Sequence, residues 1–482
     1  RTYPDNSSAH ILGYVSQISA KDLKTKKYLK DLSVPGMAIG KTGLEKKLDK
    51  DIIGQVGFQR YEVNAFGKRI KEIQITEGQI GKSFKTTLDY EIQKYANELL
   101  EDKAAAVCVM DVYNGDIVSL VSAPTFKPNA FVHGLDKDYW NSLIKDGKKP
   151  LTNKAMSGLY PPGSTIKTLV ALSALENRII KPQDTFRCKG KIELHGEKFH
   201  CWEKKGHGIV NLRKGIQRSC DVYFYEVARK LGVDRLSETA KKFGLGKQVL
   251  SDFTEERSGV VPNTKWKKKF IGQNWYIGET LHSGIGQGYF QSTPLQLCLM
   301  TAQIANGGYE IKPRIIFENK KDYLKDYLDF KSKNPQETLP SELLVKNLNL
   351  KPLFKNQKNI NIIKDAMFSS SNEPGGTSYR HRIENPKYTF AGKTGSSQVK
   401  RFTEAQREAE VKQTDLNYKD RDHALFVAFA PYKDPKYAIS VVVEHGGSGG
   451  SAAAPLAKKI IKKVIERHDL RKEINYSKGG SV

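Results

Sequence analysis

Short apolar-polar repeats and turns make up the first 85 residues of the chain. Tyr61-Glu-Val-Asn and Ile73-Gln-Ile-Thr have the period of two that is typical of strands. The charged stretch Gly43-Leu-Glu-Lys-Lys-Leu-Asp-Lys has helical spacing instead. This mixture predicts a separate module of short strands and helices over residues 1–85.

The pattern changes from Thr87 onward. Leu88 to Asp102 is spaced as a helix, and the apolar run Ala104 to Tyr113 follows it. A second run begins at Ile117, and the Asn114-Gly115 dipeptide between the two runs favours a two-residue hairpin turn. We therefore expect the sheet of a second domain, residues 86–470, to begin here.

Helical spacing gives way to strands further along the second domain. Ser164 to Phe243 is helical in pattern, apart from a segment with Gly, Cys and His between Phe186 and Gly208. Three later stretches are dense in β-branched and aromatic residues and predict strands: Tyr388-Thr-Phe-Ala, His423-Ala-Leu-Phe-Val-Ala-Phe-Ala and Tyr437-Ala-Ile-Ser-Val-Val-Val-Glu. A last helix over Ala453 to Arg467 precedes a polar tail, residues 471–482, which we expect to be flexible. The predicted fold class is α+β.

Composition narrows the classes of function. The chain has 482 residues, 38% of them hydrophobic, which suffices for two or three domains with buried cores. Its net charge of +26 comes from lysines spread along the chain, without an RNA-binding aromatic signature, so a solvated basic surface is favoured over a nucleic acid partner. No apolar run is long enough to span a bilayer, and a targeting or anchoring segment upstream of Arg1 is left open.

The sharpest local feature is Tyr160-Pro-Pro-Gly-Ser-Thr-Ile-Lys167, which leads into an Ala- and Leu-rich run. Pro and Gly before a helical pattern place Ser164 at the helix start, and residues three apart share one helix face. The Lys167 amine can therefore reach the Ser164 hydroxyl and accept its proton, if its pKa is depressed. By itself this spacing fits equally an N-cap serine with a solvent lysine.

Two further motifs follow in chain order and favour the catalytic interpretation. Ser219-Cys220-Asp221 precedes an apolar helical stretch, and brings a hydroxyl and a carboxylate that can relay a proton. Lys393-Thr394-Gly395 follows Tyr388-Thr-Phe-Ala and suits a substrate carboxylate. Lys41-Thr42-Gly43 repeats the third motif, but it precedes the serine and enters a charged helix, so we interpret it as a turn.

The three motifs together resemble those of the penicillin-binding proteins and the active-site serine β-lactamases. Asn153-Lys-Ala, Gly284-Ile-Gly-Gln-Gly-Tyr-Phe-Gln-Ser-Thr-Pro-Leu-Gln-Leu and the opening Arg1-Thr-Tyr-Pro extend the resemblance over nearly the whole chain. They are similar to class B penicillin-binding proteins, in particular the elongation-type penicillin-binding protein 2, which tends to carry Ser-x-Asp at the second motif as here. We interpret the glycine-rich Gly284-Ile-Gly-Gln-Gly as close packing near the site, since no Lys-Ser/Thr follows it as in a phosphate loop.

Catalytic roles follow from this resemblance. It implies that Ser164 is the acylated nucleophile and Lys167 its general base, while Ser219 and Asp221 assist proton transfer. An asparagine would donate a hydrogen bond from its amide, whereas a carboxylate accepts, so we expect Asp221 to depend on Lys167 or another cation.

Binding roles follow in the same way. The resemblance implies that Lys393 and Thr394 bind the carboxylate of the substrate or of a β-lactam. Gly395 would let a peptide lie against the strand edge, and the backbone N–H groups of Ser164 and Ser396 would form the oxyanion hole.

The architecture that the resemblance implies is an N-terminal pedestal and a transpeptidase domain whose five-stranded sheet is flanked by helices. Relatives carry a single transmembrane anchor upstream, so the protein would act at the periplasmic face of the bacterial inner membrane. Its partners would be peptidoglycan stem peptides, β-lactam antibiotics, a SEDS-family glycosyltransferase of the RodA type and a rod-shape scaffold protein of the MreC type. Catalysis would need no cofactor.

Three functions remain open at this point. A D,D-transpeptidase attacks the D-Ala-D-Ala bond of a stem peptide and passes the acyl group to an amine. A β-lactamase or β-lactam sensor shares the acylation residues, although the module before residue 85 favours the transpeptidase because a β-lactamase is much shorter. A non-enzymatic scaffold is disfavoured because every expected catalytic side chain is present.

Three of the five cysteines and one histidine fall within a short stretch, spaced Cys-x12-Cys-x5-His-x12-Cys. These residues, Cys188, Cys201, His207 and Cys220, predict a structural zinc ion with four protein ligands and no open position. His195 and His200 are near enough to replace His207, and a disulfide or buried thiols are the alternatives. Cys108 and Cys298 lie in apolar runs and are expected in the core.

Overall fold

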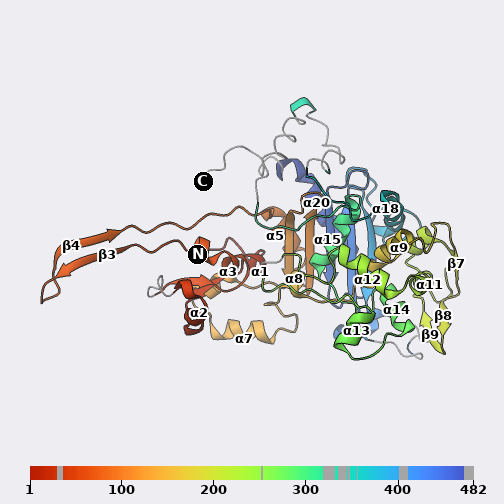
Figure 1. Ribbon diagram of the computed structural model, residues 1–482, viewed down its shortest axis with the longest axis horizontal. Helices are drawn as coiled ribbons and strands as arrows, with labels where there is room; N and C mark the ends of the chain where they lie inside the picture. Colours follow the sequence, from red (N-terminus) through yellow and green to blue (C-terminus); the bar gives the residue numbers. More distant parts are fainter. Residues whose placement is uncertain are drawn as a thin grey trace. The chain divides into compact units, whose positions relative to one another are not determined.

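The computed structural model describes residues 1–29, 36–250, 253–317, 332–334, 345, 348–354, 356–400, 406 and 411–471. The chain, drawn in Figure 1, divides into two compact units. Unit 1 comprises Arg1–Thr86, Thr125–Leu151 and Asp252–Glu255, and unit 2 comprises Thr87–Pro124, Thr152–Ser251 and Glu256–Val482. Unit 1 thus includes residues from beyond the expected boundary at residue 85. The expected flexible tail, residues 471–482, lies outside the described residues except for Arg471.

Unit 1 contains short helices and two small antiparallel sheets, β1-β2 and β3-β4. Its elements are α1 (Ala9–Leu12), β1 (Val15–Gln17), α2 (Ala20–Thr25), η1 (Lys27–Leu29), β2 (Ala38–Gly40), α3 (Gly43–Lys47), α4 (Asp49–Ile52), β3 (Phe58–Val63), β4 (Arg69–Thr76), α6 (Pro128–His133) and α7 (Lys137–Lys145). Ala9 packs with Phe126, Phe131 and Leu143 in a small core, which explains why the segment after Thr125 belongs to this unit. Lys41-Thr42-Gly43 enters a helix rather than forming a separate turn: Thr42 is the N-cap of α3 and Gly43 is its first residue.

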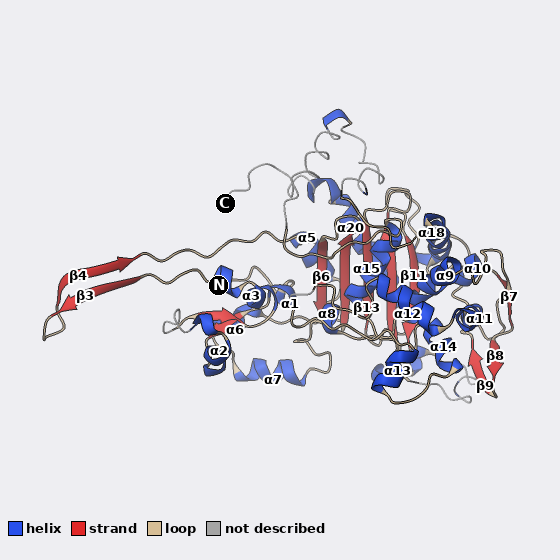
Figure 2. Cartoon of the chain, in the orientation of Figure 1, coloured by secondary structure: helices blue, strands red, loops and turns tan. Residues whose placement is uncertain are grey.

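Unit 2 is built on a five-stranded antiparallel sheet with the strand order β11-β12-β13-β5-β6 (Figure 2). The strands are β5 (Ala105–Asp111), β6 (Ile117–Ala123), β11 (Ala391–Ser397), β12 (His423–Ala430) and β13 (Tyr437–Val443). Ile439 of the central strand pairs with Val109 on one side and Ala428 on the other, so the sheet joins distant parts of the sequence. β11 is an edge strand. The predicted sheet flanked by helices is confirmed.

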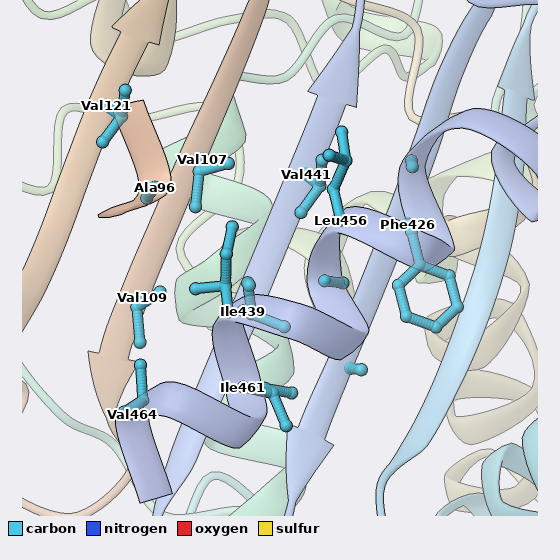
Figure 3. Packing of buried hydrophobic residues seen from close by; sticks show 14 of the residues in the cluster. Ala96, Val107, Val109, Val121, Phe426, Ile439, Val441, Leu456, Ile461 and Val464 are labelled. Atoms are coloured by element: carbon cyan, nitrogen blue, oxygen red, sulfur yellow. The ribbon is translucent and has the colours of Figure 1, made fainter. Parts of the chain in front are cut away.

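Helices cover both faces of this sheet, which is why its strands are apolar on both sides. The helices of unit 2 used below are α5 (Tyr90–Glu98), α9 (Lys167–Glu176), α11 (Asp221–Leu231), α13 (Thr264–Phe270), α14 (Ile277–Gly284), α15 (Pro294–Ala305), α18 (Gln357–Asn372) and α20 (Ala454–Glu466). α5 and α20 cover one face, where Ile461 and Val464 join Ile439 in one buried cluster (Figure 3). On the other face the Ser440 hydroxyl donates to the Pro294 carbonyl of α15 at 2.6 Å.

Several predicted elements form with different bounds. The helix expected over Leu88 to Asp102 is the shorter α5, and Lys393-Thr-Gly lies inside β11 rather than after it. The predicted two-residue turn at Asn114-Gly115 is wrong, because Asp111 N donates to Asp116 O at 2.9 Å and residues 112–115 form the loop. The Asp111 carboxylate stabilises this wider loop by accepting from the backbone N–H of Tyr113 at 3.0 Å. Of the helices in the described part of the chain, none combines the length and apolar character needed to cross a membrane.

Candidate active site

Ser164 lies in a 3-10 turn, η2 (Gly163–Ile166), that leads directly into α9. Gly163 before it has φ +53°, and a Cβ there would lie 2.5 Å from the Ser396 carbonyl oxygen. Glycine is therefore required for this turn to approach β11. Gly163 N also donates to Gly286 O at 2.9 Å, so the glycine-rich segment packs against the serine turn, as expected.

Lys167 is fully buried and directs its amine at the second motif. Its Nζ lies 2.7 Å from Asp221 Oδ1, 2.9 Å from Ser219 O and 3.3 Å from Ser219 Oγ. An ammonium has three donors, and these acceptors can use all of them. The expected partner Ser164 is three residues away on the same turn, yet the hydrogen bonds of the amine run to the second motif.

The second motif is held by an unusual backbone conformation and by Trp202. Ser219 has φ +54°, and Asp221 begins α11 directly after it. Trp202 donates from its backbone N–H to Asp221 Oδ2 at 2.9 Å and from its indole Nε1 to Ser219 O at 3.1 Å. Burial raises the pKa of Asp221, and Lys167 opposes this shift. The sequence analysis missed Trp202, although it directly follows Cys201 in the segment with Gly, Cys and His.

The third motif contributes a second buried amine. Lys393 Nζ donates to Ser219 Oγ at 2.8 Å and to Thr394 O at 3.0 Å. Burial and the nearby Lys167 lower the pKa of Lys393 well below its usual range. Thr394 Oγ1 donates to Thr377 Oγ1 at 2.7 Å, and Thr377 is a second residue that the sequence analysis missed because it lies in a loop without a recognisable motif.

Gly395 and Ser396 lie on the outer edge strand of the sheet. A Cβ on Gly395 would lie 3.0 Å from Thr165 Cγ2, so the serine turn packs closely against β11 here. Ser396 is exposed, and its carbonyl accepts from Gln287 Nε2 at 3.1 Å. An edge strand has unpaired backbone groups to which an extended peptide can add.

The arrangement supports acyl transfer. The Ser219 hydroxyl lies between two lysine amines, at 3.3 Å from Lys167 Nζ and 2.8 Å from Lys393 Nζ. A hydroxyl in that position can accept a proton from one group and donate its own to another. Ser164 lies in the 3-10 turn directly before Lys167, so a candidate nucleophile, a candidate base and a candidate relay come from neighbouring segments.

Cys188, Cys201, His207 and Cys220 form one cluster, whose ligand atoms all lie within 4.8 Å of one another. His207 Nδ1 faces the sulfur atoms, 3.5 Å from Cys201 Sγ and 3.7 Å from Cys188 Sγ. Tetrahedral zinc with Zn–S of about 2.3 Å and Zn–N of about 2.0 Å places such N and S atoms about 3.5 Å apart. The cluster therefore has the donors and spacing for zinc, although His207 Nε2 is buried without a hydrogen-bond partner among the described residues.

All five cysteines are free thiols in this structure. A hydrogen bond from Cys220 is the largest of the effects that lower the pKa of Cys201, and that same bond and burial raise the pKa of Cys220. Cys108 and Cys298 are buried in the core, as expected. The histidine in the cluster is His207, and neither His195 nor His200 belongs to it.

Comparison with known proteins gives a consistent result for both units. Residues 105–462 match the penicillin binding protein transpeptidase domain, and residues 1–86 match the penicillin-binding protein dimerisation domain. The peptidoglycan D,D-transpeptidase MrdA of Salmonella typhimurium is 35% identical over 471 residues, which cover 97% of this chain and 73% of that protein.

Two solved structures are similar over most of the chain. The complex between penicillin-binding protein PBP2 and MreC from Helicobacter pylori gives a TM-score of 0.81 at 35% identity, covering 96% of this chain and 78% of that chain. Pseudomonas aeruginosa PBP2 in complex with WCK 5153 gives a TM-score of 0.77 at 33% identity, covering 96% and 89%.

Replacement of Asp221 by alanine should strongly destabilise unit 2, because it leaves the Lys167 ammonium buried without its carboxylate. The side chains of this pair are 0% and 13% exposed, and breaking such a pair costs about 3 kcal/mol. Urea unfolding measures the loss. The matched control Glu193→Ala, which breaks the exposed pair with Lys191, should change the free energy of unfolding by less than about 1 kcal/mol. Equal stability of the two variants would contradict the buried pair.

Proposed function

Because the chain belongs to the penicillin-binding protein transpeptidase family, and within it to the class B penicillin-binding protein 2 group, we propose that Ser164 is the residue acylated by stem peptides and β-lactams. The protein is a serine-type peptidoglycan D,D-transpeptidase that cross-links stem peptides during cell elongation. The observation that carries the assignment of Ser164 is its position in the 3-10 turn that leads into α9, whose first residue Lys167 contacts Ser219 and Asp221 through its amine.

Acylation begins when Ser164 Oγ attacks the carbonyl carbon between the two D-alanines. Lys167 first passes one proton through the Ser219 hydroxyl to the amine of Lys393, and its own amine then takes the hydroxyl proton of Ser164. The carbonyl oxygen becomes an oxyanion near the backbone N–H groups of Ser164 and Ser396. The C–N bond then breaks. The proton passes from Lys167 through the Ser219 hydroxyl to the leaving nitrogen, and D-alanine departs with its amine intact.

Transfer reverses this path. The acceptor amine attacks the ester carbon, and its proton returns through Ser219 and Lys167 to Ser164 Oγ as the ester bond breaks. The products are a new amide cross-link and free Ser164. Asp221 does not exchange a proton in this scheme. It holds Lys167 at 2.7 Å and compensates the charge when that amine is protonated.

We assign binding of the substrate carboxylate to Thr394, and Lys393 lies deeper in the site. The Lys393 side chain is buried and bonded to Ser219, so it positions the relay. Thr394 is the outer member of the pair, and its hydroxyl would turn its hydrogen from Thr377 Oγ1 to the carboxylate. Gly395 leaves room beside the edge strand β11 for the backbone of an extended stem peptide.

A β-lactamase or β-lactam sensor is disfavoured by the N-terminal match. Residues 1–86 match a penicillin-binding protein dimerisation domain, and the relative MrdA is named a peptidoglycan D,D-transpeptidase. A non-enzymatic scaffold would not need two buried lysines around one serine hydroxyl, because buried amines are costly to retain.

Incubation with fluorescent penicillin tests the nucleophile. Wild-type protein should form a stable covalent adduct of one penicillin per chain. Ser164→Ala should form none while its thermal transition stays nearly unchanged, and Lys167→Ala should lose acylation because the hydroxyl then lacks its base. The matched control Ser396→Ala keeps its backbone N–H and should still be labelled. Labelling of Ser164→Ala would make the assignment wrong.

Zinc at the cysteine cluster is our second proposal. Cys188, Cys201, His207 and Cys220 would bind it with four protein ligands, so its role would be structural. Two of the ligands adjoin the relay: Cys220 lies between Ser219 and Asp221, and Asp221 N donates to Cys201 Sγ at 3.4 Å. A bound ion would therefore restrain the second motif from behind.

Metal analysis of protein purified without added zinc tests this proposal. We expect about one equivalent per chain, as four protein ligands suit one tetrahedral ion. Cys201→Ser should lose the zinc and lower the thermal transition, because binding energy contributes to folding. The control Cys298→Ser, whose Sγ bonds to the Cys108 carbonyl instead, should retain it. A metal-free wild-type protein with a Cys188–Cys201 disulfide would contradict the site.

Partners and location complete the proposal. We assign the N-terminal unit to docking of a rod-shape scaffold protein of the MreC type and a RodA-type SEDS glycosyltransferase, at the periplasmic face of the inner membrane. The similarity to a PBP2 that forms a complex with MreC supports the first partner. The β3–β4 hairpin offers exposed apolar side chains for it, since Ile70 and Ile73 are 63% and 64% exposed. The membrane anchor stays an expectation of the resemblance.

Charges placed on the hairpin test the docking surface. Ile70→Asp with Ile73→Asp should weaken binding to an MreC-type scaffold at least about tenfold, because burying two unpaired carboxylates costs more than 1.4 kcal/mol. Penicillin labelling should not change, as the hairpin belongs to unit 1. Lys71→Ala on the same strand is the control. Unchanged scaffold affinity in pull-down titrations would contradict docking on this hairpin.

A further inference from the structure

Helices α13 and α14 are labelled in Figure 1, and five aromatic side chains lie on α13 and in the loops before and after α14. We name them the aromatic shelf: Trp266, Phe270, Trp275, Tyr276 and Tyr289. Phe270 is 66% exposed and Tyr276 is 64% exposed, while Tyr289 is at 36%. Such a concentration of exposed rings in one place marks a binding surface more often than it marks a core.

Contacts among the rings, and with the buried side chain of Lys267, hold the aromatic shelf in place. Trp266 contacts Phe270 and Tyr289 with ring centroids 6.0 Å and 5.4 Å apart. Buried Lys267 pairs with Glu279 at 2.5 Å and places its Nζ 4.6 Å from the centre of the Tyr276 ring. The rings are therefore held before any ligand arrives, and little conformational entropy is lost on binding.

The shelf is continuous with the active site. Gly286 accepts from Gly163, the residue before the nucleophile, and Gln287 donates to Ser396 O at 3.1 Å. Tyr289 follows two residues later in the same loop. The D-Ala-D-Ala end of a stem peptide lies at Ser164, and the glycan lies at the other end of that peptide, a few residues of about 3.5 Å each away. A surface beside the site, such as the shelf, is therefore within reach of the glycan.

We propose that the aromatic shelf binds the glycan strand of peptidoglycan, a site that rests on the proposed transpeptidase function. Pyranose rings have apolar C–H faces that stack on aromatic rings, while their hydroxyls stay in water. The exposed Lys265, Lys268 and Lys269 on α13 add positive charge, which suits a strand that carries lactyl and stem-peptide carboxylates. The combination of rings and cations at the edge of the site matches this substrate better than a neutral apolar partner.

Binding of a peptide-free tetrasaccharide of β-1,4-linked N-acetylglucosamine and N-acetylmuramic acid tests the proposal. Wild-type protein and the control Tyr90→Ala should bind it equally by calorimetry, since Tyr90 is an exposed ring on another helix of unit 2. Phe270→Ala with Tyr276→Ala should lose at least about tenfold in affinity. Tyr276→Phe, which keeps the ring, should bind like wild type, and all four proteins should be acylated by penicillin at the same rate.

The outcomes separate the two proposals. Failure of penicillin to acylate wild-type protein overturns the transpeptidase assignment, whatever the glycan does. Normal acylation with no glycan binding, or with equal binding by the double variant, overturns the shelf alone. The glycan site would also be overturned if the double variant kept its affinity for the glycan but lost binding to the glycosyltransferase. The aromatic shelf would then be a contact for that protein.

Discussion

Two lysine amines share one serine hydroxyl in the interior of unit 2, and the rest of the site is arranged around that contact. Lys167 and Lys393 both reach Ser219, and Asp221 is the carboxylate bonded to Lys167. Two buried ammonium groups beside one carboxylate leave a net charge in a medium of low dielectric, which is unfavourable. The strongly lowered pKa of Lys393 is the consequence, since loss of one proton removes the excess charge. The site therefore contains an amine, that of Lys393, which can accept a proton, and it needs no histidine for this purpose.

The shared contact requires support from segments that are distant in the sequence. Ser219 must keep a left-handed backbone conformation for its carbonyl and hydroxyl to face Lys167, and the indole N–H of Trp202 bonds that carbonyl in place. The same segment supplies Cys201, whose sulfur accepts from Asp221 N. Cys201 and Trp202, which follow each other between two strands, therefore connect the thiol cluster with the second motif.

Much of the fold could be predicted from local sequence pattern. The composition and the spacing of apolar residues predict strands such as β13 and helices such as α20. The three motifs are equally local, so Ser164, Lys167 and Ser219 could be predicted from the sequence. Trp202 and Thr377 could not, since a backbone N–H and a hydroxyl in loops carry no pattern of their own. The expected contact of Lys167 with Ser164 shows that spacing does not determine hydrogen-bond partners. Spacing on a helix places two side chains on one face, but the strongest nearby acceptor determines where the amine points.

The glycine-rich segment shows how close packing can serve chemistry. A Cβ on Gly286 would lie 2.2 Å from the Gly163 carbonyl oxygen, and a Cβ on Gly163 would clash with Ser396 in turn. Three chain segments therefore meet backbone to backbone beside Ser164, and side chains are excluded from this contact. Because the contact is made of backbone, the positions of the serine turn, the edge strand and the loop to Tyr289 are fixed together. A substrate that touches all three is then held by one rigid surface, which is the condition for aligning a carbonyl carbon with Ser164 Oγ.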